Sequence, residues 1–184
     1  MKSKLSVLFA ILALICVLVV FNFGKVRSVF QATPDEVVTE VPAKEITLGG
    51  MDSFFKGAGW IDFSGKPSLT DPKFFDGTKA IYVHLWASWC APCLNEIPEL
   101  IEYAKKHKDQ AYFVLVSLDD SQEDLTKFLK SFPAMNSDLF FKIWDQDKKL
   151  SKFVDADRLP MTIVLDRKTG KLREVRSVVN WKTL

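Results

Sequence analysis

Two cysteines separated by two residues, in the segment Trp89-Cys-Ala-Pro-Cys93, constrain this chain more than any other feature. The apolar run before them, Ala80 to Trp86, predicts a buried strand, and Leu94 to His107 predicts a helix. The pair therefore lies at a helix N-terminus, where unpaired N–H groups and the helix dipole favour a thiolate over a thiol. A thiolate of low pKa attacks disulfides, and a second cysteine one turn later can resolve the mixed disulfide. The segment indicates thiol–disulfide exchange.

A static structural disulfide is the alternative for Cys90 and Cys93. Closing so short a loop removes little entropy from the unfolded chain, so such a disulfide would stabilise the fold only slightly. We expect Cys90, at the exposed edge of the helix, to be the attacking thiolate and Cys93 to lie deeper. Trp86 is expected in the core, and Trp89 on a semi-exposed contact surface.

The first 30 residues predict a membrane anchor. Residues 5–23 are apolar except for Ser6 and Asn22, and these 19 residues approach the ~20 that a spanning helix needs. They are longer than the apolar region of a cleaved signal peptide. Cys16 is expected to be an ordinary apolar residue of this signal-anchor helix. The flanking charges orient the helix only weakly, and we expect the N-terminus inside and the domain on the periplasmic, extracytoplasmic side of the cytoplasmic (inner) membrane.

Residues 31–48 mix prolines, threonine and acids without periodicity, which predicts a linker. The predicted folded domain is 49–184. It begins with a glycine-rich stretch to Gly59, followed by a hairpin or loop over residues 60–78. The chain has 25 Lys and Arg against 23 Asp and Glu, and it contains no basic stripe. We therefore expect no nucleic-acid partner.

From Ala80 onward, strand and helix patterns alternate. A second buried strand is predicted over Tyr112–Ser117, and a capping box at Ser121 opens a helix that buries Leu125 to Phe132 on one face. Leu150–Val154 predicts a short helix, and Met161–Leu165 with Leu172–Val179 a terminal antiparallel hairpin. This order is typical of an α/β sandwich.

This order, together with Trp86-Ala-Ser-Trp-Cys-Ala-Pro-Cys93, resembles the thioredoxin superfamily, in particular its membrane-anchored TlpA-like and ResA-like branch. The resemblance runs from about Ile61 to Trp181. Cys93-Leu-Asn-Glu-Ile-Pro98 matches the C-x-x-E-x-P pattern of the branch, and Leu159-Pro-Met-Thr-Ile-Val-Leu-Asp166 matches the strand that carries its cis-proline. The resemblance implies a thioredoxin-like three-layer sandwich, with a mixed central sheet and helices on both faces.

The resemblance also implies roles for the site residues. Cys90 and Cys93 would form the redox-active disulfide, and Glu96 would influence its protonation; the alternative is an acid that merely suits the helix dipole. Pro160, if cis, would expose neighbouring backbone to an extended peptide. The predicted substrate-binding residues are Trp89, Ala91, Pro92 and Leu159.

Two departures from the family pattern matter. His84 stands where thioredoxin has a buried acid, and it could accept a proton from Cys93 or be a neutral core histidine. The chain also reaches Leu184 only a few residues after its last strand, so the C-terminal helix of the family is expected to be short or missing. That could leave apolar surface exposed or covered by a partner.

The resulting prediction is a membrane-tethered thiol–disulfide oxidoreductase that reduces specific protein disulfides, of the cytochrome c maturation or oxidase copper-centre type. Its partners would be a disulfide-containing protein substrate and a transmembrane electron donor, and no cofactor or metal is expected. One alternative is a copper(I) carrier that uses the same cysteines with a histidine, His84 or His107. A zinc site would need a second pair of ligands, which we do not find in the sequence. A peroxidase would need a threonine at the position of Ala87.

Overall fold

The computed structural model describes residues 46–184, so the predicted anchor at residues 5–23 lies outside the described residues. Within this range, no helix has both the length and the apolar character that crossing a membrane requires. The helices are α2 (Leu48–Gly57), α3 (Ala91–His107), α4 (Gln122–Ser131) and α5 (Lys149–Phe153), with 3-10 turns η1 (Pro72–Phe75) and η2 (Pro133–Asn136). The strands are β1 (Ala80–Trp86), β2 (Ala111–Ser117), β3 (Phe141–Trp144), β4 (Met161–Asp166) and β5 (Lys171–Val175).

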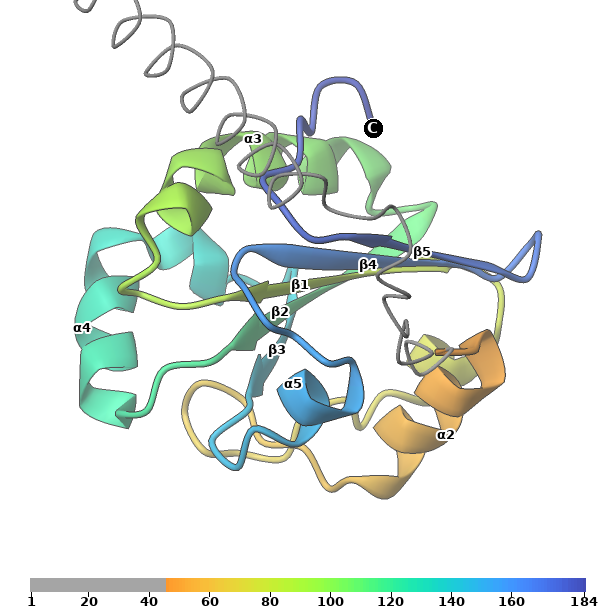
Figure 1. Ribbon diagram of the computed structural model, residues 1–184, viewed down its shortest axis with the longest axis horizontal. Coiled ribbons are helices and arrows are strands. Elements are labelled where there is room, and N and C mark those ends of the chain that lie inside the picture. Colours follow the sequence, from red (N-terminus) through yellow and green to blue (C-terminus); the bar gives the residue numbers. More distant parts are fainter. Residues whose placement is uncertain (1–45) are drawn as a thin grey trace, which may run out of the picture. The chain divides into compact units, whose positions relative to one another are not determined.

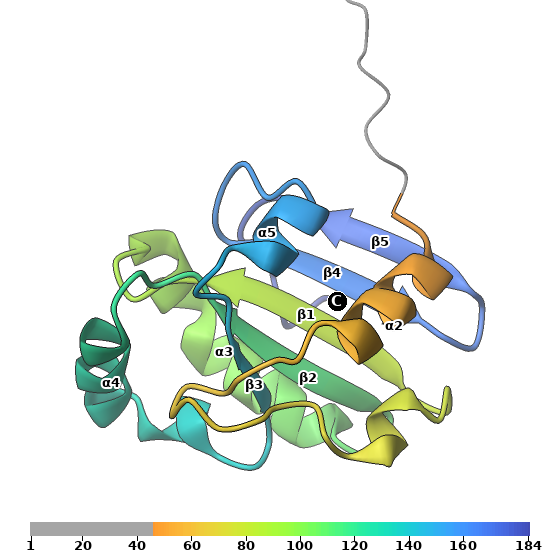
Figure 2. The ribbon, with the colours of Figure 1, turned by 90° about the horizontal axis from the view of Figure 1, so that it is seen from below.

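The five strands form one mixed sheet in the order β3-β2-β1-β4-β5. β1, β2 and β3 run parallel, whereas β4 pairs antiparallel with both β1 and β5. Figure 1 shows α3 on one side of the sheet and α2 and α5 on the other, and Figure 2 shows the five strands side by side. The expected thioredoxin-like α/β arrangement with a mixed central sheet is confirmed.

Each face of the sheet has its own apolar core, because side chains alternate along a strand. In β1, Ile81, Val83 and Leu85 contribute to the core under α2 and α5. Trp86 lies in the core under α3 and α4, with Tyr82 packed against it. The central β1 is therefore buried on both faces, and it carries the chain directly to the cysteines.

Helix α2 was not apparent in the sequence, where its three glycines suggested irregular structure. Thr47 caps it by accepting a hydrogen bond from the Gly50 N–H at 3.1 Å. Met51 and Phe55, four residues apart on one face, are buried in the core of the α2 side. Tertiary packing of this face outweighs the low helix propensity of glycine.

The C-terminal helix is expected to be short or missing, and among the described residues no helix follows β5, which ends at Val175 rather than at Val179. Residues 176–184, which we call the C-terminal segment, return to the α3 side instead. Val179 and Trp181 of this segment are buried in the core there. Within residues 46–184, the exposed large apolar side chains are those of Trp89 and Val178. A short irregular segment, rather than a helix, thus covers this part of the sheet.

Candidate active site at the Cys90–Cys93 disulfide

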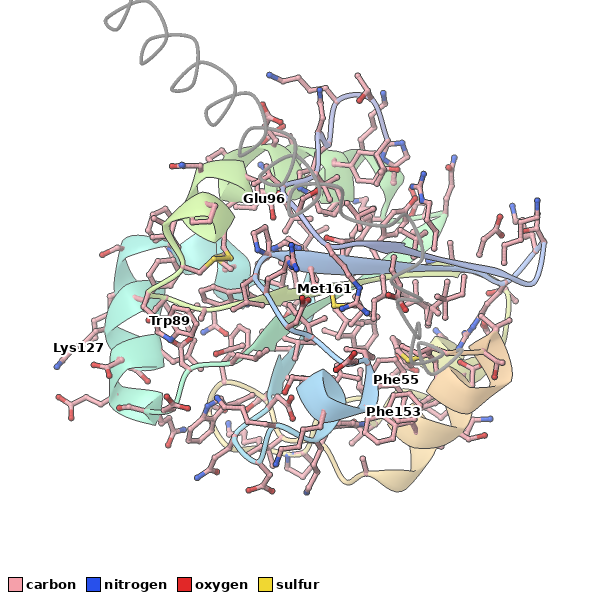
Figure 3. The ribbon with its side chains drawn as sticks, viewed as in Figure 1. Phe55, Trp89, Glu96, Lys127, Phe153 and Met161 are labelled. Atoms are coloured by element: carbon pink, nitrogen blue, oxygen red, sulfur yellow. A yellow bond between two sulfur atoms is a disulfide. The ribbon has the colours of Figure 1, made fainter. Side chains whose placement is uncertain are left out.

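Cys90 and Cys93 are joined by a disulfide at the start of α3, which Figure 3 shows as a yellow bond. Cys90 is the N-cap residue of the helix, and its Sγ accepts a hydrogen bond from the Cys93 N–H at 3.4 Å. Pro92 occupies the first turn, where a missing N–H breaks no helical hydrogen bond. Cys90 is 5% exposed and Cys93 is 0% exposed, so Cys93 is the deeper of the two, as expected.

Asp119 fixes the loop that leads into the cysteines. Its carboxylate accepts hydrogen bonds from the Ser88 N–H at 3.0 Å, the Ser88 hydroxyl at 2.6 Å and the Ser117 hydroxyl at 2.7 Å. Asp119 is 1% exposed, so these bonds compensate the burial of its polar atoms. The sequence alone does not single out Asp119, because its contact with Ser88 depends on the parallel pairing of β1 with β2.

An open groove of about 570 Å³ lies beside Cys90. It brings together the four residues predicted to bind substrate: Trp89, Ala91, Pro92 and Leu159. Four further residues line it that the sequence did not indicate: Leu118, Ala156, Asp157 and Arg158. Trp89 is 67% exposed, and Figure 3 labels it. A surface-exposed indole beside a disulfide gives the groove an apolar contact for a docking chain.

Pro160 directly follows Leu159, a residue that lines this groove. The Leu159–Pro160 peptide bond is cis, and Pro160 itself is buried and does not line the groove. The preceding loop is held by Arg176, which donates hydrogen bonds to the carbonyl oxygens of Val154 and Asp155 at 3.2 and 2.6 Å. This guanidinium also contacts the Asp157 carboxylate at 3.3 Å. Arg176, the residue after β5, therefore holds the loop that contributes Asp157 to the groove.

His84 and Glu96 meet beneath the first turns of α3. His84 Nε2 lies 3.3 Å from Glu96 Oε1, although the two atoms are not aligned for a regular hydrogen bond. His84 Nδ1 is 3.0 Å from the Thr162 hydroxyl, and Glu96 Oε2 accepts the Val179 N–H at 2.8 Å. Glu96 follows Cys93 by one helical turn and shares its side of α3 (Figure 3 labels Glu96).

Burial governs the charge of this pair. Because a buried charge loses its hydration, burial lowers the pKa of the His84 imidazole well below its usual range. Burial likewise raises the pKa of the Glu96 carboxyl to about 7, against the hydrogen bond from Val179 that favours the carboxylate. A carboxyl with a pKa near neutrality can both accept and donate a proton under physiological conditions.

The second histidine is remote from this site. His107 ends α3, where its Nδ1 lies 2.9 Å from the Tyr103 carbonyl oxygen and its ring packs at a tilt against the Tyr103 ring. His107 is half-buried. In the described part of the chain, no three His, Cys, Asp or Glu side chains are grouped so that they could hold a metal ion.

Comparison with known proteins assigns the family. A thioredoxin-like family model matches residues 77–172. Thioredoxin from Alicyclobacillus acidocaldarius is 33% identical over 72 residues, which cover 37% of this chain and 69% of that protein. The thiol-disulfide oxidoreductase ResA from Bacillus cereus is 23% identical over 159 residues, which cover 85% of this chain and 74% of the relative.

A solved structure agrees at the level of the fold. A secreted Mycobacterium tuberculosis disulfide oxidoreductase, homologous to E. coli DsbE, superposes with a TM-score of 0.56 at 18% identity, covering 67% of this chain and 88% of that one. The chain spans 52% to 74% of the length of the ResA proteins it matches. The family model covers more than half of the chain and includes both cysteines, so the chain belongs to the thioredoxin-like family, with similarity to its ResA members.

Proposed function

We propose that this chain is a membrane-tethered, extracytoplasmic thiol–disulfide oxidoreductase that reduces specific protein disulfides through Cys90 and Cys93. The observation that carries the proposal is the disulfide at the N-terminus of α3, with Cys90 lining an open groove. That helix terminus favours a thiolate once the disulfide is reduced. The groove supplies a place for a polypeptide next to the reactive sulfur.

Relatives support the type of reaction. Several ResA proteins and YkuV from Bacillus subtilis carry the name thiol-disulfide oxidoreductase, and YkuV is 29% identical over 102 residues. By the resemblance, the substrate would be an apocytochrome c or an oxidase copper-centre protein with paired cysteines. A transmembrane electron donor would restore the dithiol. The apolar residues 5–23 would tether the domain to the outer face of the cytoplasmic membrane.

The reaction consists of two exchange steps. The Cys90 thiolate attacks one sulfur of the substrate disulfide, a Cys90–substrate bond forms, and the electron pair of the broken bond leaves on the second substrate sulfur. Cys93 then gives up its proton and attacks Cys90 Sγ, which releases the first substrate sulfur as a thiolate. The substrate gains two electrons, and the cysteine pair loses two. Glu96 accepts the Cys93 proton and passes it on, and the second proton comes from water.

The activity is tested with the full chain purified in detergent, by following the reduction of insulin disulfides with dithiothreitol as electron source. The wild-type chain should accelerate the reaction, and Cys90→Ser should abolish the acceleration. Cys16→Ser is the matched control, because Cys16 is the third cysteine of the chain and lies in the predicted anchor. Full activity of the Cys90→Ser variant would show that the proposal is wrong.

The tether and the side of the membrane need a separate experiment. In intact cells, a membrane-impermeant maleimide should label the reduced Cys90 of the full chain, whereas Cys90→Ser should show no such labelling. Alkaline carbonate should leave the chain in the membrane fraction. Release into the soluble fraction would contradict the tether, and labelling only after lysis would contradict the extracytoplasmic domain.

A further inference from the structure

The C-terminal segment covers the buried pair of His84 and Glu96. The backbone N–H of Val179 donates a hydrogen bond of 2.8 Å to Glu96 Oε2. The ring of Trp181 packs edge-on against the His84 ring, with centroids 5.9 Å apart. Both residues of the segment are buried, and Trp181 is only 1% exposed. One short stretch of chain therefore touches both members of the pair.

Three polar atoms at this contact lack a regular hydrogen-bond partner. They are His84 Nε2, Glu96 Oε1 and the indole Nε1 of Trp181, and they make up three of the five such buried side-chain atoms in residues 46–184. The indole N–H of Trp181 nevertheless stabilises the charged form of Glu96 and thereby lowers the pKa of its carboxyl. Buried polar groups are normally paired, so three unpaired ones at a single contact call for an explanation.

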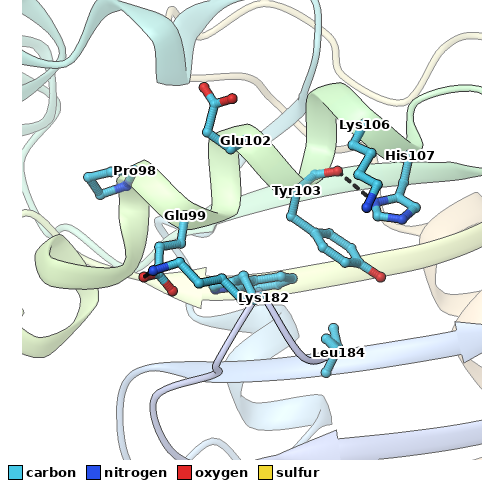
Figure 4. A pocket seen from close by; sticks show the side chains of 9 residues that line it. Pro98, Glu99, Glu102, Tyr103, Lys106, His107, Lys182 and Leu184 are labelled. Carbon is cyan, nitrogen blue, oxygen red and sulfur yellow. Dashed lines mark hydrogen bonds and ion pairs between the residues drawn. The ribbon is translucent and has the colours of Figure 1, made fainter.

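On its outer side, the segment faces a pocket of about 640 Å³ between α3 and the chain end, shown in Figure 4. Trp181 lines this pocket as well as packing on His84. Beside it, Lys182 of the segment forms an ion pair of 2.8 Å with Glu99 of α3. The indole therefore separates a solvent-accessible pocket from the buried pair.

We propose that Trp181 and the Val179 backbone are positioning residues that keep the His84–Glu96 pair dry and thereby fix the pH at which Glu96 exchanges its proton. The inference rests on the proposed function, in which Glu96 serves Cys93. In the described residues this irregular segment, rather than a helix, covers the α3 side of the sheet, and it reaches the proton-exchanging group itself.

The charged and titratable groups around Glu96 come from three elements. β1 contributes His84, and α3 contributes Cys93 and Glu99, of which the Glu99 charge raises the pKa of Glu96. The C-terminal segment contributes Lys182, which partly balances Glu99. From β4, the uncharged Thr162 contacts His84. Removing Trp181 has two opposed effects: losing its indole N–H raises the pKa of Glu96, and hydrating the carboxyl lowers it. Hydration should dominate, because burial is the largest cause of the raised pKa.

The test measures the protonation of Glu96 directly. In the oxidised full chain, the infrared band of a protonated carboxyl is assigned to Glu96 by its loss in Glu96→Gln and followed against pH. Trp181→Ala should move the midpoint down by about one pH unit or more, since water then reaches the carboxyl. Trp181→Phe keeps an aromatic cover and should leave the midpoint unshifted or slightly higher. Trp60→Ala, a buried tryptophan in the core of the opposite face, is the matched control and should leave it unchanged.

A second variant covers the case in which Trp181→Ala does not fold. Asn180 is exposed, and its side chain accepts the Lys182 N–H at 3.1 Å, which fixes the turn around Trp181. Asn180→Gly should loosen the cover without disturbing the core, and it should lower the midpoint by a smaller amount. An unchanged midpoint in Asn180→Gly, or in a folded Trp181→Ala, would overturn the inference.

The proposed function is judged separately by insulin reduction with the same proteins. If Trp181→Ala lowers the Glu96 midpoint but the wild-type chain does not reduce insulin, the role of the cover is supported and the proposed oxidoreductase function is refuted. An active wild type whose Trp181→Ala and Asn180→Gly variants keep the wild-type midpoint would refute the cover alone.

Discussion

His84 Nε2 lies 3.3 Å from Glu96 Oε1, and each side chain is 2% exposed. β1 supplies the imidazole and α3 the carboxyl, so the contact joins the central strand to the helix that carries both cysteines. Burial opposes a charge on either group. Glu96 is therefore protonated in part at neutral pH, one turn from the sulfur that must lose a proton.

The pH dependence of turnover should report this carboxyl. Because the pKa of Glu96 is raised to about 7, the rate of the resolving step should rise as pH increases through this value, where Glu96 becomes a proton acceptor. Glu96→Gln should lose this inflection and slow the step by roughly 10–100-fold at pH 7. Single-turnover reduction of a peptide disulfide between pH 5 and 9 measures it. A Gln variant with the wild-type profile would rule out the role of Glu96.

The free energy of unfolding should depend on pH, and the raised pKa of Glu96 sets the direction of this dependence. The folded-state pKa of Glu96 lies above its unfolded value, so its contribution is fully present below about pH 4.5 and is lost as pH rises through about 7. His84 acts oppositely, because its lowered pKa costs stability as pH falls below about 6.5. As the pH rises from 5 to 8, the free energy of unfolding of Glu96→Gln should therefore increase relative to that of the wild type by roughly 1–3 kcal/mol. Urea unfolding of the oxidised chain measures the gain, and parallel curves for the two proteins would contradict it.

The Asp119 carboxylate should be needed to fix the approach to Cys90. Asp119→Ala leaves the partly buried Ser88 N–H and hydroxyl and the buried Ser117 hydroxyl without their acceptor, so the free energy of unfolding should fall by about 1–3 kcal/mol. Disulfide reduction should slow severalfold, and Asp119→Asn should restore part of it. Asp124→Ala, an exposed acid of α4, is the matched control for charge. Equal effects at Asp119 and Asp124 would show that the contact with Ser88 is unimportant.

Arg158 should influence which polypeptides dock. Its side chain is exposed at the groove and is paired only with the adjacent Asp157 among the contacts described. Arg158→Glu should raise KM several-fold for peptides with acidic residues beside the cystine and lower it for basic ones, with kcat nearly unchanged. Arg173→Glu makes the same charge change on β5, away from the groove. A KM that responds equally to both variants would assign the effect to net charge alone.

The two cysteines should have distinct roles. In Cys93→Ser, the attack by Cys90 should proceed but remain unresolved, so a mixed disulfide with substrate should accumulate. The Cys90→Ser variant should form no mixed disulfide with substrate, because Cys93 is fully buried. Non-reducing electrophoresis followed by mass spectrometry identifies the trapped cysteine. Trapping through Cys93 in the Cys90→Ser variant would reverse the assignment.

The sequence predicted those parts of the fold that depend on local pattern. β1 has the predicted bounds, and Ser121 caps α4 by accepting the Asp124 N–H at 3.3 Å. The predicted groove residues do line one groove, because the strand–helix junction and the loop before Pro160 carry strong motifs. β3 was missed because four residues give too short a pattern.

The remaining features depend on contacts between distant residues. Residues 84 and 96 could each be singled out, but the sequence did not indicate that they meet at 3.3 Å. Trp181 gave no signal of its own, because a tryptophan near the end of a chain has no periodicity that would bury it. Its place over His84 depends on tertiary packing, because its ring is buried in the core of the α3 side.

The reduction potential of the Cys90–Cys93 couple in the full chain tests the central claim most directly. It is measured by equilibrating the protein with dithiothreitol buffers and trapping the free thiols. A reductant supplied from across the membrane should have a potential well below about −200 mV, in the range of reducing thioredoxins. A potential of about −120 mV would instead describe an oxidant of folding proteins. A Cys90–Cys93 pair that cannot be reduced and reoxidised would contradict redox catalysis altogether.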